Sequence, residues 1–408
     1  MPVNAAGSVR QDARTLEVLA PEIGVRPEAG GGTSGFPSRM APPVTSSTST
    51  SVEIGGRVLL SFGGCDYLGL AHHPAVLAAA REAMGVYGLS TTASRVTTGN
   101  TAAHNRLEDD VSRLLGQPAA VLVPEGYTAN LALAQALARR VGVAVIDERA
   151  HRSLPDAAVA GGLRIVRYAH LDAGDAARRL GEIGREPAAI LTDGVFTADG
   201  AVAPVRELLN ALRTHDDLLV VDDCHGVGVL AEGRGTCRFL GVSDPRIVLT
   251  TTLAKGIGCY GGAVAGQAAV VDEVRRHATA FICTTPVPPA IAAAASAAIR
   301  VLEHDRLRHV ALAANAGALR AAVRSLGVGV ADQPTPIVAF AMPDQAAMER
   351  LHNALMEEGI LAPLIRYPGG PAERYFRLTV TAEHTAEQIE RLREAMARLI
   401  REALGATR

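Results

Sequence analysis

Apolar and polar positions alternate in blocks along most of this chain, from about Val52 to residue 300. Runs with the length and composition of buried strands are AAVLVP, VAVIDE, LRIVRYAH, AAILTDGVF, LLVVDD and RIVLTTT, and amphipathic stretches such as YTANLALAQALARR and VRELLNALRTHD lie between them. Buried strands separated by helices predict a mainly parallel α/β sheet. Ligands of such sheets bind beyond the carboxyl ends of the strands, so polar residues directly after these runs are candidates for chemistry.

The two ends of the chain show other patterns. Residues 1–52 are rich in Gly, Pro, Ser and Thr, which predicts a flexible N-terminal arm with packed structure beginning near Val52. After an Ala-rich helix near residues 288–304 the expected strands are fewer, namely PIVAFAM, ILAPLIR and YFRLTVT, and a last helix is expected over Thr385–Leu404. We therefore expect a large domain at 53–300 and a smaller α+β domain at 301–408.

Composition narrows the classes of function. The 408 residues include 40 Lys and Arg against 42 Asp and Glu, and this near-neutral balance argues against nucleic-acid binding through bulk charge. The five cysteines are odd in number and form no C-x-x-C pair, so neither a disulfide framework nor a metal site is indicated. Neither a signal peptide nor an apolar run of spanning length is found. We expect a cytoplasmic protein without a membrane span.

Only one of the 40 basic residues is a lysine, Lys255, and all the others are arginines. Arginine keeps its proton in proteins, whereas a lysine amine can lose its proton and condense with a carbonyl group. The single lysine is therefore a candidate for Schiff-base chemistry. The alternative is that Lys255 is a chance remainder of an arginine-biased composition. The residues around Lys255 are needed to distinguish these two interpretations.

The run LLVVDDCHGVG places Asp222, Asp223 and His225 at the end of a buried strand. A P-loop NTPase would need G-x-x-x-x-G-K-[ST] elsewhere, but the only lysine lies in TTLAKGIG, which lacks that spacing. A dinucleotide fingerprint is disfavoured because the glycines follow the acidic cluster and AEGRG interrupts the helix that must come next. Two interpretations remain: acids that cap a helix, or a carboxylate that keeps the nitrogen of a pyridinium cofactor protonated.

The run RIVLTTTLAKGIG predicts a strand that ends in a polar loop containing Thr252 and Lys255. A lysine at a rigid strand end beside hydroxyl groups suits a covalent cofactor link and a phosphate contact in one loop. The alternative is a solvent-exposed lysine, which would require coincidence because the chain has no other.

Eight motifs in this order resemble the α-oxoamine synthase family of pyridoxal phosphate (PLP) enzymes: CDYLGLAHHP, STTASRVTTGNTAAHNRLE, EGYTAN, AHRSL, TDGVFTADG, VVDDCHGVG, TTLAKG and CTTPVPPA. The resemblance runs from about Val52 to the C-terminus. It implies an α/β chain of fold type I of the PLP-dependent enzymes, the aspartate aminotransferase-like fold, with pyridoxal 5'-phosphate as cofactor.

Taken position by position, the resemblance implies a role for each motif residue. Lys255 would form the Schiff base, Asp222 would pair with the pyridine nitrogen and His225 would approach the phenolic oxygen of the cofactor. Cys224 would lie under the ring, in place of the usual Ala, and His151 would stack on the opposite face.

The phosphate is expected at the start of a helix, where the amides of Gly126 and Tyr127 and the helix dipole suit an anion. The resemblance adds Thr252 as a phosphate ligand, and it implies that Thr284 and Thr285 reach the phosphate of a neighbouring subunit, hence a homodimer with shared sites. Thr197 would lie near a cofactor oxygen, and Asp193 stands where the family has Glu.

The chain departs from the family pattern where the resemblance implies substrate contacts. Cys65 in CDYLGL replaces the usual Asn, so the anchoring of the substrate should differ. The segment IRYPGGPAERYFRLT keeps Arg366 and Arg377 but changes and shortens the turn between them. An arginine fork is a natural partner of a substrate carboxylate, and we expect this role for Arg366 ahead of Arg377.

The resemblance implies an acyltransferase that condenses an amino acid with an acyl thioester of CoA or a carrier protein and loses carbon dioxide to give an α-amino ketone. Lys255 would remove the α-proton and His151 would orient the substrate. One alternative is an aminotransferase or another amino-acid-transforming PLP enzyme of the same fold, which Cys65 and the altered Arg366 loop favour. A second is a regulatory protein that keeps the fold without turnover.

Overall fold

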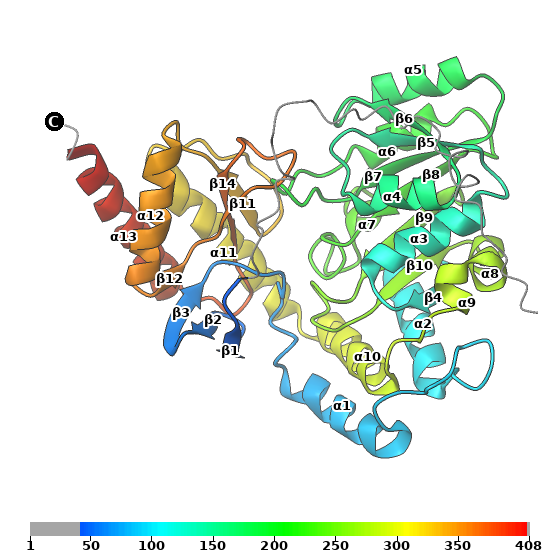
Figure 1. The fold of residues 1–408 in the computed structure, drawn as a ribbon, viewed down its shortest axis with the longest axis horizontal. Coiled ribbons are helices and arrows are strands. Elements are labelled where there is room, and N and C mark those ends of the chain that lie inside the picture. Colours follow the sequence, from blue (N-terminus) through cyan, green and yellow to red (C-terminus); the bar gives the residue numbers. More distant parts are fainter. Residues whose placement is uncertain (1–40, 406–408) are drawn as a thin grey trace, which may run out of the picture. The chain divides into compact units, whose positions relative to one another are not determined.

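The computed structural model describes residues 41–405, and its largest sheet has seven strands in the order β4-β10-β9-β8-β7-β5-β6 (Figure 1). Strand β10 runs antiparallel to its neighbours β4 and β9, whereas the pairs among β9, β8, β7, β5 and β6 are parallel. The predicted mainly parallel α/β sheet is therefore confirmed. Its strands are β4 (Ala119–Val123), β5 (Val143–Asp147), β6 (Arg164–Tyr168), β7 (Ala188–Asp193), β8 (Leu218–Asp222), β9 (Ile247–Thr252) and β10 (Gly262–Gly266).

Helices cover both faces of this sheet because side chains alternate along each buried strand. In β8, Leu219 and Val221 join one apolar core, and Leu218 and Val220 join the other. Strands buried on both faces are apolar throughout, so they appear in the sequence as continuous runs. The first core includes α1 (Pro74–Tyr87), α2 (Ala102–Leu115), α5 (Ala173–Ile183), α6 (Val205–Ala211), α7 (Thr236–Phe239) and α10 (Pro289–His304), and the second includes α3 (Gly126–Leu137), α4 (Ser153–Ala160), α8 (Ala268–His277) and α9 (Thr279–Ile282).

There are two smaller sheets, and one of them joins segments from early and late in the chain. One has the order β1-β2-β3-β12 and pairs β3 with β12 in parallel, with Leu60 opposite Ile360. The other has the order β11-β14-β13 and is antiparallel. A third apolar core, which includes Phe62 and Phe340, lies beneath them. The elements are β1 (Val44–Ser47), β2 (Ser51–Ile54), β3 (Arg57–Ser61), β11 (Ile337–Phe340), β12 (Ile360–Leu361), β13 (Leu364–Ile365), β14 (Tyr375–Thr379), α11 (Arg306–Arg324), α12 (Gln345–Glu357) and α13 (Ala386–Gly405).

Strands begin before the first expected domain boundary, and a helix crosses the second. Of the predicted arm, residues 1–40 lie outside the described residues, and the remainder contains β1 and the start of β2, so strands begin before Val52. All side chains of β1 are exposed, and an edge strand that pairs through its backbone leaves no apolar signal in the sequence. The expected boundary at residue 300 falls inside α10, and β3 pairs with β12 rather than with the seven-stranded sheet.

The elements expected late in the chain are present, with one interruption. PIVAFAM contains β11, YFRLTVT contains β14, and α13 begins one residue later than expected. ILAPLIR is divided into β12 and β13, which lie in different sheets, because Pro363 between them has no N–H to donate. Within residues 41–405, no helix has the length and apolar composition that crossing a bilayer requires.

Candidate active site

The carboxyl ends of three neighbouring strands meet at one edge of the seven-stranded sheet. Asp193 at the end of β7 lies opposite Asp222 on β8, which lies opposite Thr250 on β9. A cavity of about 360 Å³ adjoins this edge. Its lining combines strand ends with the starts of α3 and α4: Glu125, Gly126, Tyr127, His151, Ser153, Asp193, Val195, Thr197, Asp222, Cys224, His225, Thr252, Ala254 and Lys255.

Lys255 lies in the loop that follows β9, and its Nζ is 2.9 Å from Nε2 of His225. Two glycines allow this approach. A Cβ on Gly228, whose φ is +81°, would lie 2.6 Å from the Cα of Gly256, so the loop after β8 and the Lys255 loop can touch only through glycine backbone. This contact between the two loops brings Lys255 close to His225, which follows the carboxyl end of β8.

Asp222 is held by hydrogen bonds to both of its carboxylate oxygens. Asn130 Nδ2 donates to Oδ2 at 2.6 Å, and the amide of Cys224 donates to Oδ1 at 3.2 Å. Asn130 is itself oriented by the Thr250 hydroxyl, which donates to its Oδ1 at 2.6 Å. Sequence reasoning missed Asn130, although it lies in the EGYTAN motif four residues after Gly126 and therefore on the same face of α3.

Asp223, the second acid of the DDCH motif, does not line the cavity. Its carboxylate accepts hydrogen bonds from the amide of Thr236 at 2.7 Å and from the Thr236 hydroxyl at 2.6 Å. A Cβ on Gly226 would lie 2.0 Å from its Oδ1, so this side chain fills a space that the neighbouring backbone leaves for it. Asp223 holds the loop after β8 in place, and only Asp222 faces the cavity.

His151 is fixed through both its backbone and its ring. Its amide donates to the carboxylate of Asp193 at 3.1 Å, and its Nδ1 is 2.7 Å from the hydroxyl of Ser153. The ring is nearly parallel to that of Tyr367, with centroids 6.5 Å apart. Burial lowers the pKa of His151, and the nearby Lys255 lowers it further, although Asp222 acts in the opposite direction. The ring is therefore neutral at neutral pH.

Two buried titratable groups of the cavity have strongly shifted pKa values. Burial lowers the pKa of His225 well below its usual value, and the cations Lys255 and Arg377 add to this effect. Burial raises the pKa of Asp193 well above its usual value, and the Asp222 carboxylate opposite adds to it. The other ring nitrogen of His225, Nδ1, is 2.7 Å from the hydroxyl of Tyr67, a residue that sequence reasoning also missed.

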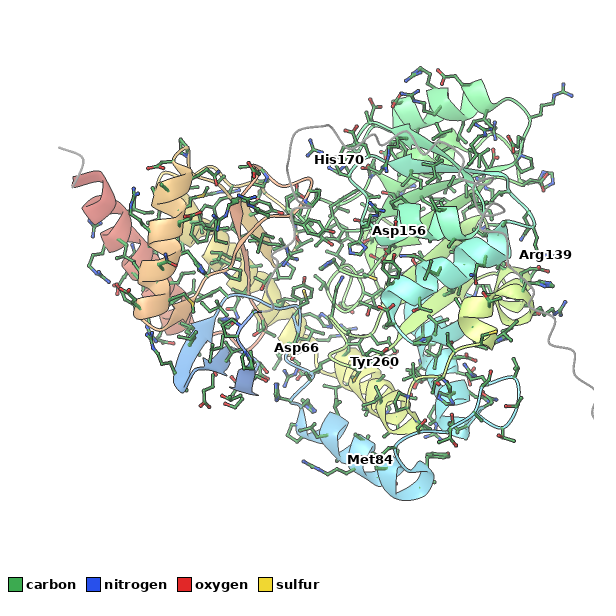
Figure 2. The ribbon with its side chains drawn as sticks, viewed as in Figure 1. Asp66, Met84, Arg139, Asp156, His170 and Tyr260 are labelled. Atoms are coloured by element: carbon green, nitrogen blue, oxygen red, sulfur yellow. The ribbon has the colours of Figure 1, made fainter. Side chains whose placement is uncertain are left out.

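The end of the cavity at α3 has the shape expected of an anion subsite, with one difference. A Cβ on Gly126 would lie 2.8 Å from the Cβ of Thr252 and 3.2 Å from Sγ of Cys224, so glycine keeps this space open. The carboxylate of Glu125 accepts from the amide of Tyr127 at 3.2 Å, which occupies one of the two amides assigned to the phosphate. The Tyr127 hydroxyl donates to Asp156, labelled in Figure 2, at 2.8 Å.

Five expected site residues do not line this cavity. The Thr284 hydroxyl donates to the carbonyl of Ala280, and Thr285 follows it in the segment before α10. Arg366 is about half exposed and pairs with Glu373 at 3.2 Å. Arg377 is partly buried, and its Nε donates to the carbonyl of Thr197 at 2.6 Å, which places it behind one wall of the cavity. Cys65 lies beside the Tyr67 hydroxyl, which Arg377 also faces.

These groups fit the pyridine, aldehyde and phosphate of PLP. The carboxylate of Asp222 suits a protonated ring nitrogen, the Lys255 amine suits an aldehyde, and the glycine-lined space beside Thr252 suits a phosphate. Nη2 of Arg377 is buried and has no partner among the described residues, which leaves a guanidinium nitrogen for a carboxylate.

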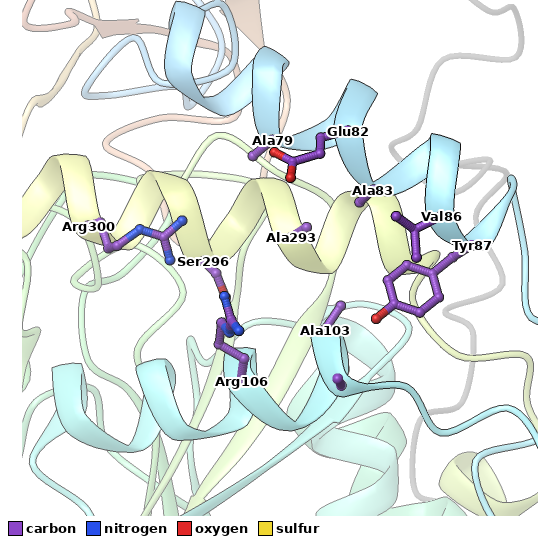
Figure 3. Close-up of a pocket in the computed structure, with 11 residues that line it drawn as sticks. Ala79, Glu82, Ala83, Val86, Tyr87, Ala103, Arg106, Ala293, Ser296 and Arg300 are labelled. Carbon is purple, nitrogen blue, oxygen red and sulfur yellow. The ribbon is translucent and has the colours of Figure 1, made fainter.

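A second cavity, of about 250 Å³, lies among α1, α2 and α10. Five of its eleven lining residues are alanines, and Arg106 extends across it from α2 toward α10 (Figure 3). It contains none of the residues expected to carry chemistry, so the cavity at Lys255 is the candidate active site.

Comparisons with known proteins identify the family to which this chain belongs. The family model described as aminotransferase class I and II matches residues 57–396. The 8-amino-7-oxononanoate synthase of Thioalkalivibrio sulfidiphilus is 38% identical over 85% of this chain and 90% of its own, and that of Methylococcus capsulatus is 39% identical over 87% and 92%. A serine palmitoyltransferase from S. paucimobilis, solved with a PLP–myriocin adduct, has 28% identity and a TM-score of 0.83 over 88% of this chain and 92% of its own.

The expected family, fold and cofactor are thereby confirmed. The family match covers the seven-stranded sheet and the lysine loop, and the solved relative binds the cofactor that the cavity fits. The chain therefore belongs to the class I and II aminotransferase family of PLP-dependent enzymes and, within it, to the α-oxoamine synthases.

Proposed function

We propose that this chain uses Lys255, Asp222 and His151 to condense a small amino acid with an acyl thioester, with loss of carbon dioxide. One observation carries the assignment of residues: the only lysine, a carboxylate with two fixed donors and a neutral imidazole all line one cavity at the carboxyl ends of the strands. When bound, PLP supplies an electron sink that stabilises negative charge on the α-carbon of the amino acid.

Lys255 acts on the reacting carbon. Its amine holds the aldehyde end of the cofactor and, when it is free, takes the α-proton of the amino acid as general base. Asp222 places a negative charge at the ring nitrogen, and Asn130 and the Cys224 amide keep that carboxylate in a fixed orientation. The hydrogen bonds of His151 with Ser153 and Asp193 hold it where it would cover one face of the cofactor ring and orient the substrate carboxylate.

The substrate pair is suggested by the product for which the curated relatives are named. Carbons 8 and 9 of 8-amino-7-oxononanoate correspond to alanine after loss of carbon dioxide, and carbons 1 to 7 correspond to a heptanedioyl group. We propose alanine and a heptanedioyl thioester as substrates of this chain. Arg377, with its unpartnered Nη2 beside the cavity wall, is our candidate for a carboxylate contact, ahead of the exposed Arg366.

We also propose that the enzyme is a cytoplasmic homodimer with shared active sites. Thr284 and Thr285 precede α10 and do not line the cavity of their own chain. The family resemblance gives them a phosphate contact in the neighbouring subunit, and that role requires a second copy of the chain.

The test supplies purified protein and PLP with alanine and heptanedioyl-CoA and measures free thiol and carbon dioxide. The expected result is release of both in equal amounts, and none from the Lys255→Ala variant. A parallel reaction contains a keto acid as well, and consumption of that keto acid without thiol release would replace the synthase by an aminotransferase. If the protein never takes up PLP, both the synthase and the aminotransferase proposals are overturned, and a regulatory role remains.

A further inference from the structure

A chain of side chains runs from Lys255 through His225, which also lines the cavity, to the buried Tyr67. His225 lies between the Lys255 amine, 2.9 Å from its Nε2, and the Tyr67 hydroxyl, 2.7 Å from its Nδ1. Tyr67 is only 1% exposed and His225 only 3%. Each ring nitrogen of His225 therefore has one protein partner, and water does not replace either of them.

Tyr67 itself is held at both ends. Its carbonyl accepts from the amide of Ala382 at 2.8 Å, and its ring packs in the first apolar core. The carboxylate of the preceding residue, Asp66, accepts from the amides of Leu70 and Ala71, which closes the turn that presents Tyr67 (Asp66 is labelled in Figure 2). The Tyr67 hydroxyl is therefore held in a fixed position, and its hydrogen bond orients the ring of His225.

The hydrogen positions follow from the chemistry of the partners. A lysine ammonium only donates, so Nε2 of His225 must accept from it. Burial keeps the His225 ring neutral because it lowers the pKa, and a neutral imidazole carries one hydrogen. That hydrogen is then on Nδ1, which donates to the hydroxyl oxygen of Tyr67.

We propose that Tyr67 is a positioning residue that holds His225 in the tautomer whose Nε2 accepts from the free Lys255 ammonium, and so controls how readily Lys255 gives up its proton. This inference rests on the proposed role of Lys255 as general base. Other groups that face Lys255 from the surrounding elements are Asp193, Asp222, His151 and Cys224, and those that face the Tyr67 hydroxyl are Cys65 and Arg377. Tyr67 acts on the lysine only through His225.

The single lysine makes a direct test feasible. An amine-selective reagent modifies Lys255 and the N-terminal amine only, and mass analysis of the two peptides separates them, so the N-terminal peptide is an internal standard. The rate is measured across pH in cofactor-free protein for the wild type, Tyr67→Phe and Tyr168→Phe. Tyr168 is an equally buried tyrosine of the same core and does not contact His225.

In Tyr67→Phe the ammonium loses a fixed acceptor, so more of Lys255 is the reactive free amine at a given pH. We expect modification near neutral pH to be about fivefold faster, the equivalent of one ordinary hydrogen bond, and the rates to converge at high pH. Tyr168→Phe should match the wild type. A rate that is unchanged, or raised equally at every pH because the cavity has opened, would overturn the proposal.

A second measurement does not depend on the folding of a variant. Nitrogen-15 spectra of the cofactor-free wild type should show His225 neutral with its hydrogen on Nδ1, and a hydrogen on Nε2 or a charged ring would overturn the proposal. PLP uptake is followed separately by absorbance. If the wild type does not take up PLP, the proposed function is overturned. If the protein binds PLP but the reactivity of Lys255 is unchanged in Tyr67→Phe, only the proposed role of Tyr67 is overturned.

Discussion

Asn130 on α3 donates a hydrogen bond of 2.6 Å to the Asp222 carboxylate on β8. The same side chain accepts from the Thr250 hydroxyl on β9, so one amide ties a helix to two strand ends. Because all three residues are buried, no water replaces a lost partner. Asn130 thereby fixes the orientation of the Asp222 carboxylate relative to the packed sheet.

Replacement of Asn130 by Ala should therefore cost both stability and cofactor affinity. The change leaves a carboxylate oxygen and a hydroxyl without partners, which costs about 1 to 3 kcal/mol of unfolding free energy, measured by denaturant titration. PLP should bind roughly tenfold more weakly, because a misoriented Asp222 no longer meets the ring nitrogen. Asn210→Ala, at an exposed position on α6, is the matched control and should change neither quantity. Equal effects of the two variants would remove Asn130 from the site.

Activity should require the amine of Lys255, and a positive charge at this position should not be enough. Lys255→Arg keeps a cation but removes the amine, so we expect no covalently held cofactor and a fall in turnover of at least about 10³-fold. Borohydride reduction of the wild type followed by peptide mass analysis should give a single modified peptide that contains residue 255. A reduced cofactor adduct elsewhere, or retained in Lys255→Arg, would contradict the assignment.

Mixed dimers should recover activity if the sites are shared. A Lys255→Ala subunit has no base, and a Thr284→Ala/Thr285→Ala subunit should weaken phosphate binding in its partner. In a hybrid, one of the two sites combines the intact lysine with the intact threonines, so up to half of the wild-type activity should return. Activity of the mixture that equals the sum of the two parents would mean that each chain builds its site alone.

The contribution of Asp223 to the stability of the protein should fall as the pH rises from about 4 to 6. Burial raises the pKa of Asp223 to about 6 from an ordinary value of 3.8, so the folded chain binds this proton more tightly than the unfolded chain does. The resulting stabilisation is complete below the unfolded pKa and is lost as the pH rises through the folded one. Its full size is of the order of 3 kcal/mol.

Asp223→Asn has no proton to lose, so the unfolding free energy of the wild type should fall relative to that of the variant between pH 4 and 6. Asp216→Asn, at an exposed position before β8, serves as the control and should keep the wild-type slope. Parallel pH curves for Asp223→Asn and the wild type would show that Asp223 keeps its charge down to about pH 4.

The part of the site that follows directly from a buried strand could be predicted from the sequence. Asp222 and Lys255 come at or just after apolar runs, and parallel strands deliver such residues to one edge. Asn130, Tyr67 and Tyr367 reach the same place from a helix, from an early loop and from a late one. The helical spacing of Asn130 from Gly126 is a local signal, but the meeting of Tyr67 and Tyr367 with the strand ends is created only by the packing of distant segments.

The strands that escaped prediction have physical reasons of their own. The residues of β10, GAVAG, are mostly glycine and alanine and do not have the β-branched composition of a typical strand. A Cβ on Gly262 would lie 2.3 Å from the carbonyl of Glu125, so the small residue is required where β10 passes the start of α3. The site constrains β10 at this point more than strand propensity does.

The pairing of β3 with β12 bears on how the chain folds. Leu60 and Ile360 are about 300 residues apart, and β3 has no strand on that side until β12 is present. During synthesis, β3 cannot pair with β12 until nearly the whole chain has been made. Until then the edge of β3 is open to pairing with other strands. A long-range parallel contact of this kind is slow to form because the loop that it closes is large. We expect this sheet to be the last part of the molecule to form and the part most dependent on chaperones.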